Sequence, residues 1–331
     1  MGRKLSAFVA CLAGTMLLIV PGAMAAITVT SIAPSSGQAG ETVQCTVSGA
    51  FNVPLDVDVS GTIYKTPEFT LDNGVDPSIV GTTDAASVTA TSANLTFWLP
   101  AEAPAVWYTL EATQVSKIWI LDFPDTASLP HAFQVVPTVS SLSPYISTTG
   151  VGDLTLTVIG GSFVDSSPGV DGSSVRWNGE ALATTFHSAT RLTAIVPAAK
   201  LTASGTAEVT VMNVTAGTTS APRTFTIDTT KPTTDAINAV SVKRNKTAKL
   251  KFLIGEPVGL SPSAKVVIKI KAAKGGATVK TITINDVPMN AMQTSSFKVT
   301  LKKGSYAWYV YATDLAGNTQ ANVDRAKFTV K

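Results

Sequence analysis

The sequence predicts an all-β protein made of β-sandwiches in tandem. Apolar and polar residues alternate in runs of about five to eight residues, the pattern of a strand that buries one face. Clusters of Gly, Pro, Asn, Asp and Ser separate these runs, as turns between strands require. Only 14% of the 331 residues are charged, and no amphipathic helix is indicated. Because the chain is too long for one sandwich, we expect several in a row.

Residues 1–25 predict a secretory signal peptide. They combine a basic start, an apolar run over residues 5–20 and the small-residue site Ala23-Met24-Ala25, after which we expect cleavage. An uncleaved membrane anchor is the alternative, but the apolar run is short for a spanning helix. A lipoprotein signal at Cys11 is rejected because the run continues past it. We therefore expect a secreted, extracellular or cell-surface protein whose mature chain has no transmembrane segment.

The mature chain keeps a single cysteine, Cys45. An exported chain is free to form disulfides, but one cysteine makes an internal disulfide impossible. Each domain must therefore be held by its apolar core. Cys45 alternates with Val43 and Val47 on one face of a strand, which predicts a small buried side chain rather than a reactive thiol.

Residues 26–136 and 137–228 open and close alike, which indicates an internal repeat of roughly a hundred residues. The first opens with ITVTSIAPSSG and the second with PTVSSLSP. Each copy has an early glycine, a phenylalanine soon after it and a later strand that ends in proline. These positions are Gly49, Phe51 and Pro100 in the first copy and Gly160, Phe163 and Pro197 in the second.

The second copy resembles the IPT/TIG family of immunoglobulin-like domains. It has the family's opening before a proline, its Gly-x-x-Phe turn, its Ser-x-Thr-x-Leu strand and a central hairpin at Trp177-Asn178-Gly179. The first copy resembles the family in a divergent form, since residues 52–87 are longer and acidic and lack the Trp-Asn-Gly turn. The resemblance implies two immunoglobulin-like β-sandwiches in tandem, used for adhesion, spacing, or protein and glycan contact on a microbial surface.

Residues 229–331 predict a third sandwich after a polar linker that begins at Asp228. Two runs alternate between inward apolar residues and outward lysines. The inward residues are Ala248, Leu250, Phe252 and Ile254, then Val266, Ile268 and Ile270; the outward ones are Lys249, Lys251, Lys269 and Lys271. Gly275-Gly276 supplies a hairpin turn. The closing stretch, residues 304–318, resembles bacterial immunoglobulin-like or fibronectin type III-like domains.

The sequence indicates no catalytic residue and no enzyme. The two histidines, His131 and His187, lack metal-ligand spacing, and nucleophile elbows and phosphate-binding glycine loops are absent. Asp56 and Asp58 alternate with valines, so a solvated strand face explains them better than glycosidase chemistry.

No cofactor and no metal-ligand set is predicted, but calcium is kept as an alternative. The oxygen-rich positions are Asp228, the pair Asp165 and Asp171, and Asp314 with Asn318. None of them forms the dense Asp-x-Asp-x-Asp-Gly loop of a strong calcium motif.

Charge is distributed unevenly along the chain. Residues 26–136 hold two lysines and eleven acids, a net charge of −9; residues 137–228 carry −2; and residues 229–331, with seventeen basic and five acidic residues, carry +12. The basic segment could contact a cell-wall or extracellular polyanion, a glycan, or another protein, or pair head-to-tail with the acidic segment of a second copy. Alternatively, its lysines only protect exposed strands from aggregation. The candidate contact residues are Lys249, Lys251, Lys269, Lys271, Lys302 and Lys303.

Nucleic acid is disfavoured as a partner by the expected export and by the lack of a binding motif. The sequence therefore predicts a non-enzymatic, secreted or cell-surface binding or structural protein of a microbe. The alternative function is an extracellular carbohydrate-binding accessory protein, which would use the aromatic residues of the first segment. These residues are Trp98, Trp107, Tyr108 and Trp119.

Overall fold

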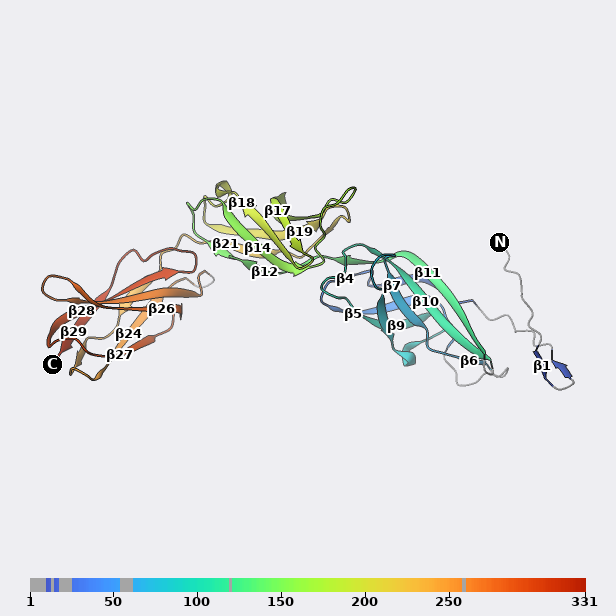
Figure 1. The fold of residues 1–331 in the computed structure, drawn as a ribbon, viewed down its shortest axis with the longest axis horizontal. Helices are drawn as coiled ribbons and strands as arrows, with labels where there is room; N and C mark the ends of the chain where they lie inside the picture. The colour runs from blue at the N-terminus through green and yellow to red at the C-terminus, as the bar shows by residue number, and fades with distance from the viewer. Residues whose placement is uncertain (1–9, 13–14, 18–25, 54–61, 119–120, 258–259) are drawn as a thin grey trace. The chain divides into compact units, whose positions relative to one another are not determined.

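The structure confirms the all-β prediction (Figure 1). It is a computed structural model that describes residues 10–12, 15–17, 26–53, 62–118, 121–257 and 260–331. The only helical elements within these ranges are two short 3-10 turns, Ala85–Ser87 and Ala198–Lys200. No helix in the described part of the chain is long and apolar enough to cross a membrane. The chain divides into two compact units, Met1–Val136 and Pro137–Lys331.

The predicted signal peptide lies mostly outside the described residues. Within it, β1 (Ala10–Leu12) pairs with β2 (Thr15–Leu17) as a short antiparallel hairpin. Cleavage after Ala25 stays a prediction.

The first unit contains one sheet of nine strands in the order β3-β5-β9-β8-β7-β10-β11-β4, with β6 paired to β10. Strand β8 pairs with β9 on one side and with β7 on the other, so the sheet continues from one half of the unit to the other. The strands are β3 (Thr28–Ala33), β4 (Ser36–Gln38), β5 (Thr42–Ala50), β6 (Thr62–Tyr64), β7 (Glu68–Asp72), β8 (Ile79–Thr83), β9 (Ser92–Trp98), β10 (Trp107–Ile118) and β11 (Leu121–Val136).

Buried side chains from both halves of this sheet meet in one apolar core. Phe97 of β9 and Phe133 of β11 pack with their ring centroids 6.2 Å apart. Cys45 is 3% exposed, and burial raises the pKa of its thiol to about 11. The prediction of a buried cysteine is therefore confirmed.

The second unit begins with a sandwich of two sheets. One sheet has the order β12-β14-β18-β17, and the other has the order β13-β21-β19-β15-β16, with β20 paired to β19. The strands are β12 (Thr138–Ser143), β13 (Ile146–Ser147), β14 (Leu154–Gly161), β15 (Ser173–Trp177), β16 (Glu180–Ala181), β17 (Ala183–Ser188), β18 (Arg191–Val196), β19 (Gly205–Asn213), β20 (Thr218–Thr219) and β21 (Arg223–Ile227).

The predicted central hairpin is present between β15 and β16. Asn178 and Gly179 both have positive φ, 50° and 85°, as a tight two-residue hairpin turn requires. Trp177 of β15 packs against Phe225 of β21, the strand on the other side of β19 in the same sheet, with ring centroids 5.0 Å apart. Both side chains belong to a core that is separate from that of the first unit.

Gly49 and Gly160 occupy matching places in the first two segments. Gly49 lies in β5 opposite Val29 of β3, and Gly160 lies in β14 opposite Val139 of β12. Each glycine is next to a bulge in the strand pairing. A Cβ atom at Gly49 would stand 1.9 Å from the carbonyl oxygen of Thr28, and one at Gly160 would stand 1.8 Å from that of Thr138. Both positions therefore require glycine for the same reason.

The third segment is again a sandwich of two sheets with its own core. The sheets have the orders β22-β24-β27 and β23-β29-β28-β25-β26. The strands are β22 (Thr233–Ala236), β23 (Val240–Val242), β24 (Thr247–Gly255), β25 (Ser263–Ala272), β26 (Thr278–Pro288), β27 (Gln293–Lys298), β28 (Gly304–Asp314) and β29 (Arg325–Val330).

The predicted alternation holds on β24 and β25, whose apolar residues are buried and whose lysines point away from the core. Gly275 and Gly276, with φ of 83° and 64°, form the turn between β25 and β26. Trp308 of β28 is fully buried and donates its indole N–H to the carbonyl oxygen of Asn238, 3.2 Å away.

Candidate functional site

The outer face of the five-stranded sheet carries lysines held over tyrosine rings. The Nζ of Lys269 lies 4.9 Å from the ring centroid of Tyr311. The Nζ of Lys271 lies 4.6 Å from that of Tyr309 and 5.8 Å from that of Tyr311. These residues come from the neighbouring strands β25 and β28, where Lys269 is directly opposite Tyr309. The rings hold the ammonium groups without neutralising them.

Three more basic residues share this face. Lys265 lies on β25, and the pairing of β28 with β29 places Arg325 opposite Tyr309 and Lys327 opposite Ala307. Arg325 also donates a hydrogen bond to the Tyr309 hydroxyl, 3.3 Å away, which helps to raise the pKa of its guanidinium. We define the basic sheet face by its charged and aromatic members: Lys265, Lys269, Lys271, Tyr309, Tyr311, Arg325 and Lys327.

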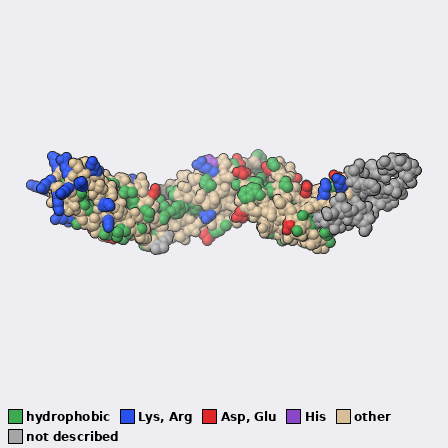
Figure 2. Space-filling model, turned by 90° about the horizontal axis from the view of Figure 1, so that it is seen from below, with side chains coloured by type: hydrophobic (Ala, Val, Ile, Leu, Met, Phe, Trp, Pro, Cys, Tyr) green, Lys and Arg blue, Asp and Glu red, His purple; other side chains and the backbone are tan. Residues whose placement is uncertain are grey.

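No outward position of β25, β28 or β29 carries an acidic side chain. Figure 2 shows Lys and Arg side chains gathered over the C-terminal segment. Cations packed on flat aromatic rings and free of carboxylate partners can bind sulfate, phosphate or carboxylate groups of a polymer. The arrangement is therefore chemically suited to a polyanion.

The six lysines predicted as one contact set lie in three places. Lys269 and Lys271 belong to the basic sheet face. Lys249 and Lys251 point outward from β24, which is in the other sheet of the sandwich. Lys302 and Lys303 precede β28 and are exposed. The sequence pattern showed which residues point outward, but not from which sheet, and it missed the tyrosines, Lys265, Arg325 and Lys327.

A second cluster is acidic and buried. The carboxylates of Asp228, Glu256 and Asp314 each offer an oxygen atom, and these oxygens lie within 4.8 Å of one another. Asp228 follows β21, Glu256 follows β24, and Asp314 ends β28. The three residues are 1%, 7% and 5% exposed, respectively.

Two of the three carboxylates are held by hydrogen bonds. Asp228 accepts from the Thr230 backbone N–H at 2.8 Å and from the Ser261 hydroxyl at 3.2 Å. Asp314 accepts from the backbone N–H groups of Gly317 and Asn318 at 2.8 and 2.7 Å. The Asn318 amide also donates to Asp314 and to the Asp228 carbonyl, both at 2.9 Å.

Glu256 differs from its neighbours because neither oxygen of its carboxylate has a hydrogen-bond partner. Burial, together with the charges of Asp228 and Asp314, raises the pKa of Glu256 to about 7. Burial also raises the pKa of Asp314, although its hydrogen bonds from Asn318 oppose that shift.

Of the calcium positions considered from the sequence, the structure joins Asp228 to Asp314 and Asn318, whereas Asp165 and Asp171 stay outside the cluster. Sequence reasoning missed Glu256. A signal was present, because Glu256 continues the buried alternation of Phe252 and Ile254. A carboxylate in the buried phase of a strand is a polar group that needs a partner.

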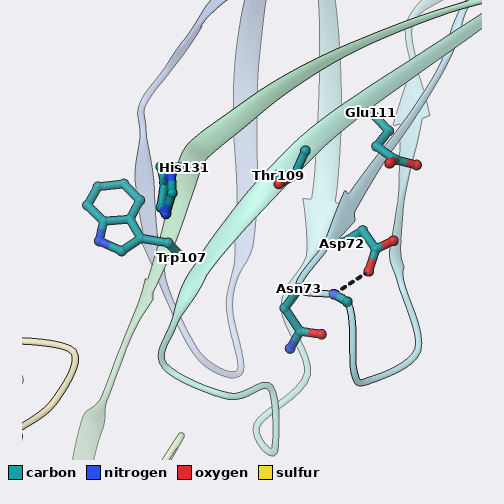
Figure 3. A pocket seen from close by; sticks show the side chains of 7 residues that line it. Asp72, Asn73, Trp107, Thr109, Glu111 and His131 are labelled. Carbon is teal, nitrogen blue, oxygen red and sulfur yellow. Dashed lines mark hydrogen bonds between the residues drawn. The ribbon is translucent and has the colours of Figure 1, made fainter.

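The first unit has an open hollow of about 400 Å³ (Figure 3). Trp107 and His131 stand edge-to-face on one side of it, with ring centroids 6.3 Å apart. Asp72 and Glu111 lie on the other side. An exposed indole beside carboxylates is a combination that can stack on and hydrogen-bond to a sugar ring.

Of the other residues predicted for carbohydrate binding, Trp98 and Tyr108 do not join this hollow. Trp98 is exposed on β9, but it is not among the residues that line the hollow. Tyr108 is 1% exposed and donates its hydroxyl to the Pro104 carbonyl oxygen, and burial raises its pKa to about 12. Trp119, Asp56 and Asp58 lie outside the described residues. His187 is exposed and hydrogen-bonds to the Thr193 hydroxyl.

Comparison with protein families confirms one part of the sequence resemblance. Residues 137–227 match the IPT/TIG domain. No curated protein matches the chain.

Many solved structures align with this chain, at low similarity. The FN1–FN3 domains of chicken CNTN1 align with 12% identity over 92% of this chain and 97% of theirs, with a TM-score of 0.31. The I67–I69 fragment of the titin I-band aligns with 11% identity over 92% and 96%, with a TM-score of 0.26. A tetra-tandem repeat from the extending region of a large adhesion protein aligns with 16% identity over 92% and 74%, with a TM-score of 0.27. Because all three TM-scores are below 0.5, we draw no conclusion about this chain from these alignments.

Proposed function

We propose that this chain is a non-enzymatic, secreted or cell-surface protein of a microbe that acts in adhesion, spacing or surface assembly. Its tandem immunoglobulin-like sandwiches provide the scaffold, and its basic sheet face binds an anionic polymer of the cell wall or the extracellular medium. The first segment is a second, divergent IPT/TIG copy, and residues 229–331 form a bacterial immunoglobulin-like or fibronectin type III-like domain. The matching roles of Gly49 and Gly160 support the relation between the first two segments.

The observation that carries the binding proposal is the pairing of Lys269 and Lys271 with Tyr309 and Tyr311. Lysines that only protect a strand edge from aggregation need no aromatic partners and no concentration on one face. Here the cations lie on inner strands of the sheet, since β25 and β28 each have a neighbour on both sides. Protection of an edge therefore does not explain them.

Binding to dextran sulfate, compared with uncharged dextran, tests this proposal. We expect the full chain to bind the sulfated polymer and to release it as salt rises from 50 to 500 mM, because exposed ionic contacts are screened. Equal binding to both polymers, or binding that salt leaves unchanged, would contradict an electrostatic contact.

The net charges of the segments support a related partner. Residues 26–136 carry a net charge of −9 and residues 229–331 carry +12. The basic segment of one copy can therefore bind the acidic segment of another copy in place of a polymer, which gives head-to-tail self-association. Sedimentation at 50 mM salt should then show assemblies that dissociate at 500 mM. A sedimentation coefficient that does not change with salt would contradict self-association and favour the anionic polymer as the partner.

A carbohydrate-binding role is the second candidate function, and the Trp107–His131 hollow favours it. Stacking on a sugar ring depends little on ionic strength. Trp107→Ala should therefore remove salt-insensitive binding to a neutral glycan panel, whereas Trp98→Ala, another exposed tryptophan of the same unit, should leave it unchanged.

A further inference from the structure

We propose that Asp228, Glu256 and Asp314 bind one divalent, oxygen-seeking cation of the calcium class. The bound ion would tie the linker after β21 to the ends of β24 and β28. This site shares no residue with the basic sheet face, so a test of cation binding and a test of polyanion binding can fail independently of each other.

The observation that points to a ligand is Glu256. Glu256 is only 7% exposed, and both of its carboxylate oxygens lack a hydrogen-bond partner. One of these oxygens lies within 4.8 Å of carboxylate oxygens of Asp228 and Asp314, so the unpartnered group points into the acidic cluster. Buried charges in proteins are normally paired or bound to a metal ion.

No basic side chain of the described residues forms an ion pair with these carboxylates. Three carboxylates at this separation repel one another in a region from which water is largely excluded. A proton or a cation must relieve that repulsion. The raised pKa values of Glu256 and Asp314 are the sign of the same repulsion and desolvation.

The ligand chemistry favours calcium over other metals. The cluster offers carboxylate oxygens and a hydroxyl from Ser261, but no imidazole or thiolate, which excludes the ligand sets preferred by zinc. Opposite oxygens on a Ca²⁺ ion are about 4.6–5.2 Å apart, and those on Mg²⁺ about 4.0–4.2 Å. The upper limit of 4.8 Å between the oxygens of the cluster therefore fits around a Ca²⁺ ion, whereas it exceeds the largest separation around Mg²⁺.

The cluster is also held in place before any ion binds. The backbone of Glu256 is fixed by Asn290, whose side chain accepts from its N–H at 2.9 Å and donates to its carbonyl at 2.7 Å. Asn318 connects Asp228 to Asp314 and accepts a hydrogen bond from the Thr148 hydroxyl at 2.6 Å. Because these contacts hold the Glu256 backbone and the other two carboxylates in place, less ordering is required on binding.

The experiment is a calcium titration of the metal-stripped full chain at pH 8, followed by thermal unfolding and calorimetry. At a hundredfold excess over its Kd, calcium should raise Tm by about 5–10 °C. Magnesium at the same concentration should give a smaller rise. Glu256→Gln should weaken calcium binding at least tenfold and remove most of the rise in Tm.

Glu256→Gln also separates a metal site from a purely structural role. Without calcium, this variant should melt at a higher temperature than the wild type, since it removes a buried charge that has no partner. Glu208→Gln, at an exposed glutamate of β19, is the matched control and should keep the full calcium response. The proposal is overturned if calcium does not raise the Tm of the wild type, if Glu256→Gln keeps the full rise, or if magnesium matches calcium.

Discussion

Replacing Gly160 by alanine tests the packing that the first two segments share. Gly160 lies in β14 opposite Val139 of β12. An added Cβ would stand 1.8 Å from the carbonyl oxygen of Thr138 and 2.7 Å from the Cζ of Phe163. Because heavy atoms in contact are about 3.5 Å apart, β12 would have to move by about 1.7 Å.

The expected cost follows from this displacement. Moving β12 weakens its pairing with β14 at Thr138 and Val139, where each backbone hydrogen bond contributes about 1 kcal/mol. Crowding against Phe163 adds about 1–3 kcal/mol. Gly160→Ala should therefore lower the free energy of unfolding by about 2–5 kcal/mol.

Urea unfolding followed by tryptophan fluorescence measures this loss. Gly152→Ala is the control, because an added Cβ there meets nothing within 4 Å and its φ is not in the left-handed region. It should change stability by less than about 0.5 kcal/mol. Equal stability of the two variants would refute the packing argument. Gly49→Ala should cost as much as Gly160→Ala if the first unit is built in the same way.

Three further outcomes are expected. Burial raises the pKa of Glu256 to about 7, so without divalent ions the folded state holds this proton more tightly than the unfolded state does. The resulting contribution to stability is fully present below pH 4.5, falls as pH rises towards about 7 and is constant above it. Urea midpoints across pH 5–8 should show this fall, and it should be smaller in Glu256→Gln. Cys45 should resist thiol reagents at pH 8 in the folded chain and react at once in urea, since its pKa is raised to about 11; rapid labelling of the native chain would contradict its burial. Trp308→Ala should cost about 3–5 kcal/mol in the third sandwich by urea unfolding, and a loss below 1 kcal/mol would show that this core is not the one described.

The strand alternation predicted the fold class and the direction of many side chains. Period-two patterns gave the correct inward residues on β24 and β25 because tertiary packing follows the same local geometry. The turns at Asn178-Gly179 and Gly275-Gly276 were predictable because their positive φ values favour these residue types. The continuous sheet through β8 was not predictable, since pairing on two sides is a long-range property.

The candidate sites depend on such long-range pairing. Lys269 and Lys271 share a face with Tyr309 and Tyr311 because β25 pairs with β28, and nothing local in the sequence specifies that neighbour. Similarly, Glu256 and Asp314 each continue the buried phase of a strand, which the sequence shows. Their approach to Asp228 required the folded arrangement.

The basic sheet face is tested most directly by two double variants with the same change in net charge. Lys269→Gln/Lys271→Gln alters the face, and Lys249→Gln/Lys251→Gln alters the outer surface of the opposite sheet. We predict that the first double variant binds dextran sulfate about tenfold more weakly than the wild type at 100 mM salt, since each exposed charge contact contributes up to about 1 kcal/mol. The second should bind as the wild type does. Equal weakening of both variants would show that net charge alone governs binding, and it would contradict a defined site on this face.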